Sequence, residues 1–462
     1  MKFKEKTSET IDGIKRAFSE FLTLPTLLIA AFLLLSIFSY SIDKAKIGWL
    51  KPLRELLKQH VFADAKATSD LLAAIAAGII SVTSLTITLL LIVVQQSAAS
   101  MTSQVFDQFL RRKTNQFYFG FFVGLALYSL ITLATVNDPF NPVLGATLAF
   151  VFTVVALYLL VLLMYTTINQ MRPVEIIEAI HNHILGSRNR QLELIEQTLR
   201  TTNFEGEFSK KINSEKHGYV AKINISKIGA AIQNKTESEV VLLVSIGSYI
   251  SYGDALAQVK TNKQSDIDVI SKAVLESIHL DRQRDVDHDA AYGIEQLEMI
   301  AWTSISTSKS NPAPGLLTIR SLRNILAQWS MDEPKSNTPK LPVVYTDNTM
   351  EKLMDTFETL AVVSSESMQH QNFIEVILAV TTLFDRLPTK WQDRADDMLL
   401  RLLSALGDHV LTAELEKSLL ALINKLNTAG RVNTAVAIQT ALKQLSQSVG
   451  KLNSRSTRVP NT

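Results

Sequence analysis

Four long apolar stretches dominate the first 172 residues of the chain. They run from Phe21 to Ile42, from Leu71 to Val94, from Phe117 to Val136 and from Val143 to Tyr165. A helix needs about 20 apolar residues to cross the hydrocarbon core of a bilayer, and all four stretches reach that length. The pattern predicts four membrane-spanning helices, the last two joined as an antiparallel hairpin by the short turn at 137–142.

The rest of the chain mixes polar and apolar positions as a soluble protein does. A helix is expected from Pro173 to about Thr201, and glycine-spaced, strand-like segments at 216–262 predict a small β-sandwich-like module. That module resembles half of a biotinyl or lipoyl domain, but it lacks the modified-lysine signature, so a structural role is the better interpretation. Helical spacing of apolar residues then predicts helices at 290–305, 348–384, 390–406, 410–426 and 429–447.

The predicted fold class is therefore a membrane α-helical domain of four transmembrane helices, followed by an α+β soluble region with the small β-module and a C-terminal helical domain. The predicted organisation is an N-terminal segment (1–20), the transmembrane domain (21–172), a connecting helix (173–215), the β-module (216–262), a helical segment with polar loops (263–332), the C-terminal helical domain (343–450) and a disordered tail (451–462).

Composition narrows the class of function. The 462 residues are 19% charged, below the roughly 25% of a soluble domain, and the shortage lies in the apolar stretches. A net charge of +2 gives the chain no strong positive electrostatic field that would attract nucleic acid, so no nucleic-acid partner is expected. The absence of cysteine excludes disulfides and thiolate chemistry. Phosphate-binding glycine loops are also absent, and no cofactor is predicted.

Basic residues near the predicted spans indicate their orientation. Five lysine or arginine residues precede the first span, three follow the second at 111–113, and the turn at 137–142 has none. By the positive-inside rule, both termini are expected in the cytoplasm. The basic connection at 43–70 opposes this orientation, because it would lie outside.

The second span is rich in hydroxyl groups. Ser81, Ser84 and Thr88 share one helix face, whereas Thr83 and Thr86 point elsewhere. One interpretation is that the shared face lines a water-filled pore in an oligomer. The other is ordinary helix packing, in which each hydroxyl bonds a carbonyl one turn earlier. No charged residue lies deep in any predicted span, so no proton-relay site is evident.

Two further features of the membrane domain suggest contacts. Gly120 and Gly124 form a small-xxx-small pair on the third span that allows close helix packing. Between the second and third spans, 97–116 is amphipathic and predicts an interfacial helix. The Arg111, Arg112 and Lys113 side chains at its end are candidates for lipid headgroup contact.

The densest polar cluster of the soluble region is the loop 281–289. Arg282, Arg284, His288 and Asp289 are its candidate site residues, with the loop 306–315 as a second side of the site. The alternative is a solvated turn in which an aspartate caps the next helix.

Glu178, His181 and His183 are candidate metal ligands, but this interpretation has less support than the polar loop 281–289 has as a site. A metal site needs three or more converging ligands. The sequence nearby supplies no second Glu-x-x-His motif that could complete such a site. A solvated helix face is the preferred interpretation, and no metal site is predicted.

Three sets of residues together resemble a family of predicted bacterial integral membrane proteins known as domain of unknown function 2254. The sets lie at Asn115-Gln116 with Gly120, Gly124 and Tyr128, at Gly218–Val220 with Gly247–Leu256, and at Arg282–Ala301. This chain departs from the family pattern at 111–113 and in the loop 306–315, where Asn311 and Pro314 replace its usual Asp and Thr. The resemblance implies an integral membrane protein of bacterial type and brings no assigned activity. The expected location is the bacterial inner membrane.

Three functions remain open on the sequence. The first is an oligomeric, channel-like protein whose second span faces the central axis and whose soluble part is cytoplasmic. The second is a membrane-anchored ligand sensor or enzyme that uses the loops 281–289 and 306–315. The third is a membrane scaffold. The lipid bilayer and further copies of the chain are the expected partners, and the transported or bound species is not encoded in the sequence.

Overall fold

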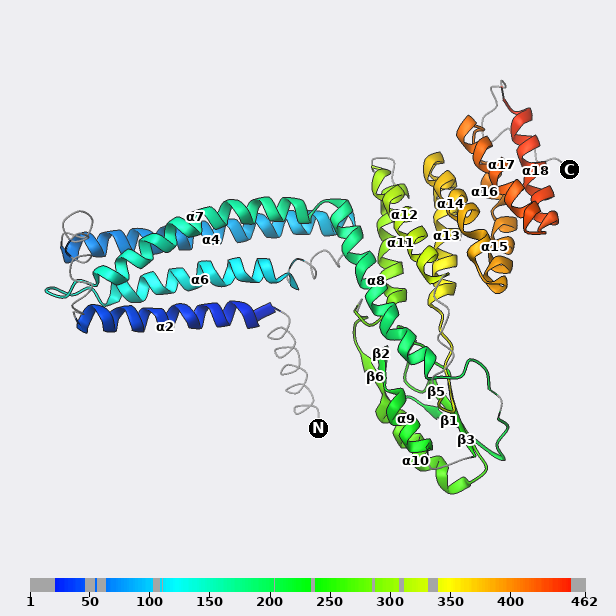
Figure 1. Ribbon diagram of the computed structural model, residues 1–462, viewed down its shortest axis with the longest axis horizontal. Coiled ribbons are helices and arrows are strands. Elements are labelled where there is room, and N and C mark those ends of the chain that lie inside the picture. The colour runs from blue at the N-terminus through cyan, green and yellow to red at the C-terminus, as the bar shows by residue number, and fades with distance from the viewer. Residues whose placement is uncertain are drawn as a thin grey trace. The chain divides into compact units, whose positions relative to one another are not determined.

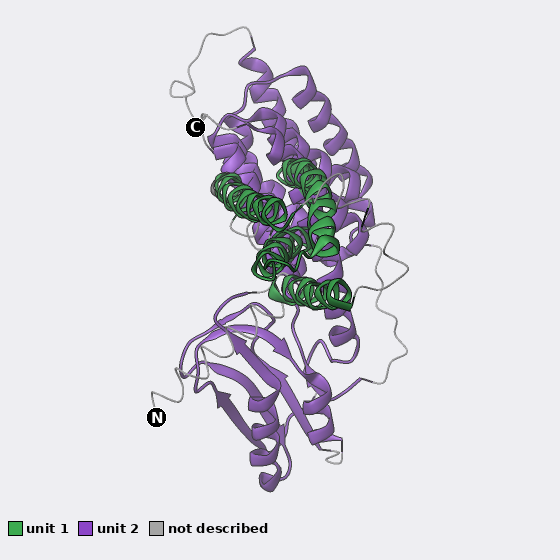
Figure 2. Ribbon diagram, turned by 90° about the vertical axis from the view of Figure 1, so that its left-hand side faces the viewer, with its two compact units in different colours: residues 1–175 green, residues 176–462 purple. Residues whose placement is uncertain are grey.

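The four apolar stretches form four long helices in the computed structural model, which describes residues 21–45, 55, 64–102, 109, 111–202, 204–233, 237–284, 287–306, 311–330 and 340–449. Among these residues, four helices are long and apolar enough to cross a membrane. They are α2 (Thr23–Ala45), α4 (Ala65–Ser100), α6 (Lys113–Ala134) and α7 (Val143–Gln170). The chain divides into two compact units, 1–175 and 176–462, which are coloured separately in Figure 2.

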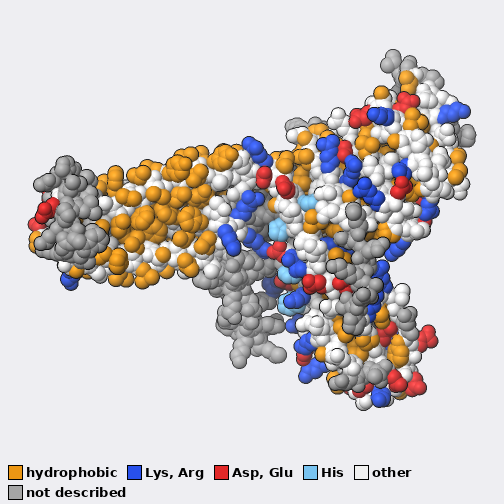
Figure 3. All heavy atoms as spheres, viewed as in Figure 1, with side chains coloured by type: hydrophobic (Ala, Val, Ile, Leu, Met, Phe, Trp, Pro, Cys, Tyr) orange, Lys and Arg blue, Asp and Glu red, His pale blue; other side chains and the backbone are white. Residues whose placement is uncertain are grey.

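Helix α6 lies at the centre of the membrane unit, because it packs against α2, α4 and α7. Its buried rings and those of its neighbours form the core, in which Phe32 of α2 makes edge contacts with Phe121 of α6 and Phe152 of α7. The outward faces are also apolar, as the hydrophobic surface of this unit in Figure 3 shows. A helix bundle that is apolar both inside and outside is suited to lipid rather than water.

The soluble unit begins with the remainder of α8 (Pro173–Glu196), which buries Ile176, Ile180 and Ile184 along one stripe. Two small sheets follow, one in the order β1-β5-β3-β7 and one in the order β4-β2-β6. Among the strand pairs of the described residues, β3–β7 alone is parallel. The strands are β1 (Phe208–Asn213), β2 (Gly218–Ile223), β3 (Ser238–Leu242), β4 (Tyr249–Ile250), β5 (Ala255–Thr261), β6 (Ile278–Asp281) and β7 (Val343–Val344).

Helices α9 (Ile225–Ile232) and α10 (Ile267–Ser277) share a hydrophobic core with these strands. The sheets therefore draw β1, β6 and β7 from outside 216–262, and they include a helix within that segment. The module is held together by burial of aliphatic residues such as Val240, Ala257 and Val259, all fully buried.

The remaining helices stack as consecutive pairs (Figure 1). Helix α11 packs on α12, α13 on α14, and α17 on α18, while α13 also packs on α11 and α14 on α12. Stacking of successive helix pairs is the arrangement of α-solenoids. The helices are α11 (Ala290–Ser306), α12 (Ala313–Trp329), α13 (Thr349–Glu366), α14 (His370–Leu383), α15 (Thr389–Arg401), α16 (Leu403–Gly407), α17 (Ala413–Thr428) and α18 (Val432–Gln447).

The predicted fold class is confirmed: four apolar helices are followed by a small mixed-sheet region and C-terminal helices. Two predicted helices were wrong in detail. The stretch 348–384 is divided at Met368, whose φ of 58° reverses the chain between α13 and α14. The stretch 390–406 is divided between α15 and α16 at Leu402. The predicted N-terminal segment and the tail 451–462 lie outside the described residues. Of the interfacial helix predicted at 97–116, residues 97–100 belong to α4 and 113–116 to α6, while 103–108 and 110 lie outside the described residues.

Candidate functional site

The hydroxyl groups of α4 divide between two environments. Ser81, Ser84 and Thr88 are exposed on the surface of the membrane unit, whereas Thr83 is half-buried with its Oγ1 enclosed. Thr88 Oγ1 donates a hydrogen bond to the carbonyl oxygen of Ser84 at 2.9 Å. Within the described part of the chain, no other helix supplies a hydrogen bond to this face. The three residues thus form a polar strip, the α4 hydroxyl face, on an otherwise apolar surface.

Small residues extend the α4 hydroxyl face by about two turns. Ala74, Ala77 and Gly78 are exposed on α4, and a Cβ atom added at Gly78 would meet nothing within 4 Å. Small side chains allow another helix to approach a membrane helix closely. This face therefore has both the shape and the hydrogen-bonding groups for contact with another polypeptide or with water.

Gly120 and Gly124 lie at a close contact between α2 and α6. A Cβ at Gly120 would stand 2.7 Å from the Cα of Pro25, and one at Gly124 would stand 2.4 Å from Cδ2 of Phe32. These glycines serve packing within one chain, so they are not available for a contact between copies.

A polar cluster that sequence reasoning missed lies at one end of the same bundle. Asp43 of α2 is buried, and its carboxylate accepts hydrogen bonds from the backbone N–H groups of Leu144 and Gly145 at 3.2 and 3.0 Å. A carboxylate at a helix N-terminus satisfies free N–H groups and opposes the helix dipole. Tyr128, fully buried, donates its hydroxyl to the carbonyl oxygen of Gly145 at 3.1 Å and lies 3.2 Å from Ser39 Oγ. The cluster fastens α2 and α6 to the start of α7.

The other end of the bundle carries the basic segment. Arg111 and Arg112 are half-buried and precede α6, while Lys113, its first residue, is exposed. The next turn is anchored by Asn115, whose Nδ2 donates to the carbonyl oxygen of Phe109 at 2.8 Å and to Gln170 Oε1 at 3.1 Å. This amide joins the start of α6 to the end of α7 and so positions the basic segment.

Arg284 and Asp289 of the loop 281–289 form a buried ion pair. Arg284 Nε donates to Asp289 Oδ2 at 2.8 Å and Nη1 donates to Glu295 Oε2 at 2.6 Å, while the guanidinium lies over the ring of Tyr292. Burial favours the neutral form of Arg284, but the hydrogen bond and charge of Asp289, followed by those of Glu295, raise its pKa overall. Asp289 Oδ1 also accepts the backbone N–H of Tyr292 and caps α11.

Gly247, at φ +85°, approaches this pair so closely that an added Cβ would lie 2.2 Å from Asp289 Oδ2. The β-module is thereby locked onto the first turn of α11. With both groups paired to each other, Arg284 and Asp289 act as a structural joint.

The other two candidates of that loop lie apart from the joint. Arg282 is exposed, and its backbone N–H donates to Asp281 Oδ1. His288 lines a cavity of about 370 Å³ together with residues of α8, β2 and the start of α9, among them Arg190 and Lys222. The structure therefore does not bring the four candidates to one point.

The loop 306–315 is described only in part, because 307–310 lie outside the described residues. Ser304 Oγ donates to the carbonyl oxygen of Asn311 at 2.6 Å and accepts the backbone N–H of Gly315 at 3.1 Å. These contacts tie the end of α11 to the start of α12. Asn311 and Pro314 therefore lie where α11 is connected to α12.

Glu178, His181 and His183 do not converge. His181 Nδ1 lies 2.9 Å from Ser321 Oγ of α12, whereas His183 Nδ1 lies 2.8 Å from Asp287 Oδ1. Among the described residues no group of three or more histidine, aspartate or glutamate side chains is arranged to hold a metal.

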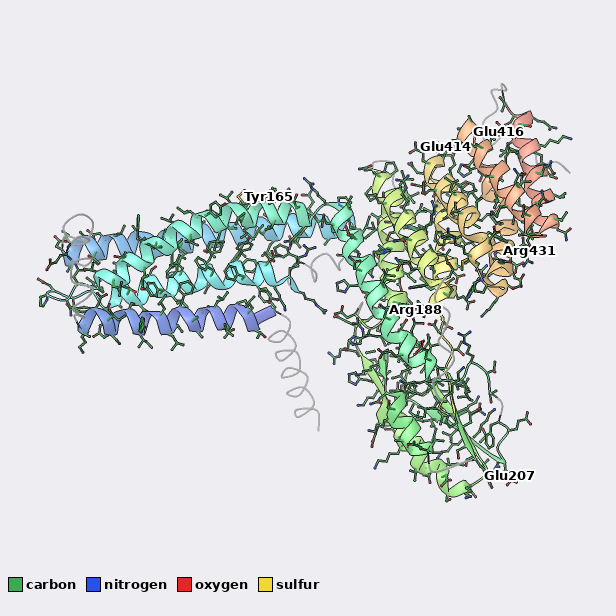
Figure 4. All side chains as sticks on the ribbon, in the orientation of Figure 1. Tyr165, Arg188, Glu207, Glu414, Glu416 and Arg431 are labelled. Atoms are coloured by element: carbon green, nitrogen blue, oxygen red, sulfur yellow. The ribbon has the colours of Figure 1, made fainter. Side chains whose placement is uncertain are left out.

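Arginines of α8 join the segments around it. Arg188, labelled in Figure 4, pairs with Asp347 at 2.6 Å and lies over the ring of Trp329. Asp347 in turn accepts the hydroxyl and backbone N–H of Thr349 at the start of α13. The side chains around α8 are engaged in such joints, which sequence reasoning missed because their partners lie more than a hundred residues away.

A histidine pair makes the stability of the helical stack pH-dependent. His370 Nδ1 lies 2.5 Å from Nδ1 of the buried His409, and the His409 ring packs on Phe373. Burial lowers the pKa of His370 below its ordinary value. Below about pH 6.5 His370 binds more protons in the unfolded chain than in the folded chain, so its contribution to the free energy of unfolding falls with falling pH, and this contribution is constant above that range.

We expect the melting temperature of the full-length protein in detergent, followed by circular dichroism, to fall between pH 7 and pH 5. The His370→Gln variant should show a shallower fall, because it removes the titrating group. His217→Gln, a substitution at an exposed histidine of the β-module, is the control and should leave the slope unchanged. An equal slope in H370Q and the unmodified protein would contradict the assignment.

These features define a class: an integral membrane protein with four apolar helices and a soluble α+β unit whose polar clusters are largely joints. The chain belongs to the family described as predicted membrane protein (DUF2254), whose model matches residues 19–371. No curated protein and no solved structure matches it. The family resemblance inferred from the three sets of motifs is thus confirmed, and the family description assigns no activity.

Proposed function

We propose that the protein self-associates in the membrane through the α4 hydroxyl face and forms a channel-like oligomer. The observation that carries this proposal is the exposure of Ser81, Ser84 and Thr88 on a surface that otherwise faces lipid. Hydroxyl groups in hydrocarbon need hydrogen-bond partners. Thr88 Oγ1 already donates to the carbonyl oxygen of Ser84, so the proposal rests on the hydroxyls of Ser81 and Ser84, to which a second copy of α4 or a column of water can supply partners where a lipid tail cannot.

The orientation and location proposed with it follow the basic residues. The segment 111–113 adjoins the start of α6, and the hairpin turn between α6 and α7 carries no basic residue. The positive-inside rule then places the N-terminus and the 176–462 unit in the cytoplasm. We infer the bacterial inner membrane as the location.

The geometry gives the sensor or enzyme alternative less support. Arg284 and Asp289 are paired with each other, and the cavity that His288 lines includes none of the other three candidates. A scaffold function requires the same self-association as a channel but no aqueous path, so an experiment can separate the two.

Cysteine cross-linking tests the association directly, because the chain contains no cysteine of its own. We expect the single variants Ser81→Cys, Ser84→Cys and Thr88→Cys to form covalent dimers when membranes are treated with a mild oxidant. Tyr158→Cys on α7, whose side chain is 69% exposed on the lipid-facing surface, is the matched control and should remain monomeric. Absence of cross-links from all three α4 variants would contradict the proposal.

Ion flux from proteoliposomes then tests the pore. A charged, membrane-impermeant thiol reagent should lower the flux through Ser84→Cys protein several-fold and leave Tyr158→Cys protein unaffected. Cross-linking without any flux would support the scaffold and overturn the channel. Gly78→Leu should convert the oligomer to monomer without changing the melting temperature of the monomer, because the added side chain meets nothing within the chain.

A further inference from the structure

A groove of about 320 Å³ lies between α12 and the end of α14, within the stack of helix pairs. Arg320, Arg323 and Asn324 of α12 line it on one side, and Glu375 of α14 and Arg386 line it on the other. Arg386 belongs to the short 3-10 helix η4 (Phe384–Arg386), which follows α14 directly. All of these residues stand on packed helical elements, so the groove is formed by the fold itself.

Among the described residues that line the groove, Glu375 is the only acidic one, and it is already paired. Arg320 Nε donates to Glu375 Oε1 at 3.1 Å, and Arg320 Nη2 donates to Glu375 Oε2 at 3.2 Å. Two parallel hydrogen bonds fix the plane of the guanidinium and leave its third nitrogen for another acceptor. The Glu375 side chain is largely buried beneath this contact, so it orients Arg320 and neutralises one positive charge.

The other two arginines are not neutralised. Within the described residues, neither Arg323 nor Arg386 pairs with a carboxylate. The neighbouring Asp385 is engaged by Lys425, whose Nζ lies 2.6 Å from its Oδ2. Arg323 lies three residues after Arg320, on the same face of α12. Three guanidinium groups against one carboxylate leave an excess of two positive charges around the groove.

The chemistry of the lining selects an anion. Guanidinium groups bind phosphate oxygens through paired, planar hydrogen bonds, and they stay charged at every physiological pH. A phosphate monoester carries a charge of about −1.5 to −2 near neutral pH, which matches the excess in the groove, whereas a lipid phosphodiester carries only one charge. The volume is at the lower end of the roughly 300–1,000 Å³ of small-molecule sites. Ala327 and Leu383 add apolar carbon to the lining.

We propose that this groove binds the phosphate monoester or pyrophosphate group of a small soluble molecule. The site is separate from the α4 hydroxyl face, so the proposal stands or falls independently of the channel.

Isothermal titration of the full-length protein in an uncharged detergent tests the proposal, with inorganic pyrophosphate as the probe. We expect saturable binding at one site per chain that weakens as sodium chloride is raised. The double variant Arg323→Gln/Arg386→Gln should bind at least tenfold more weakly. Lys417→Gln, which removes an exposed charge on α17 of the same stack, should bind as the unmodified protein does. Equal melting temperatures of these variants would show that folding is preserved.

Two results would overturn the proposal. The first is pyrophosphate binding that the double variant leaves unchanged. The second comes from a parallel titration with the short-chain lipid dihexanoyl phosphatidylglycerol, which carries a phosphodiester headgroup. Binding of that lipid as tight as the binding of pyrophosphate would assign the groove to a membrane headgroup instead of a soluble phosphate.

Discussion

Replacing Asp289 with alanine is expected to lower the free energy of unfolding of the 176–462 unit by about 3 kcal/mol. The variant leaves the guanidinium of Arg284, whose side chain is only 16% exposed, without its buried partner. It also removes the acceptor that caps the first turn of α11. Because Gly247 packs against the same carboxylate, the loop of the β-module that carries Gly247 also loses this contact with the start of α11.

Thermal unfolding in detergent measures this loss, which corresponds to a fall in melting temperature of roughly 6–12 °C for a unit of this size. Glu295→Gln is the matched control, because Glu295 contacts the same arginine but its side chain is 40% exposed. A partly exposed ion pair contributes less than about 1 kcal/mol, so this variant should shift the melting temperature by only a few degrees. Equal, small shifts in both variants would show that the Arg284–Asp289 pair is not a joint.

Replacing Gly124 with leucine should destabilise the membrane unit by about 3 kcal/mol. The first added carbon would lie 2.4 Å from the ring of Phe32, and that ring is itself enclosed by Phe121, Tyr128 and Phe152. A packed aromatic core cannot move aside without losing contacts of its own, so α2 must shift away from α6.

Titration of the purified protein with a denaturing detergent, followed by the loss of helical structure, measures the effect. Val123→Leu changes the neighbouring, partly exposed position of α6 and should leave the transition unchanged. If Gly124→Leu unfolds at the same detergent fraction as Val123→Leu, the close approach of α2 and α6 is not required for stability.

The apolar lengths of the chain were enough to predict its membrane helices. Hydrophobic length is a local property, and a lipid solvent leaves few alternatives to a helix. The division of 348–384 was not predictable in the same way. The residues around Met368 include neither glycine nor proline, so the pattern continued through the turn, and the left-handed backbone there depends on packing of α14 against α13.

The other features that the sequence did not predict depend on contacts between residues that are far apart in the chain. Strand β7 is only two residues long and pairs with β3 about a hundred positions earlier, so its two residues could not show which sheet they join. The role of Asp43 was equally hidden, because the backbone groups that it binds are 101 and 102 residues away. In the candidate loop, the capping role of Asp289 could be predicted, since a cap is local. The close contact of Gly247 with Asp289 could not be predicted, because it depends on how the β-module packs against α11.

Helix α4 has 36 residues, which at about 1.5 Å per residue makes a rod of roughly 54 Å. The hydrocarbon core is only about 30 Å thick, so the rod extends well past it. A continuous helix is stiff over this length, and any tilt within the lipid is carried to both of its ends. The part of α4 that holds the hydroxyl face and the part that extends beyond the bilayer are therefore expected to tilt together as one rigid helix. The thickness of the surrounding bilayer, which sets that tilt, becomes a mechanical input to the protein.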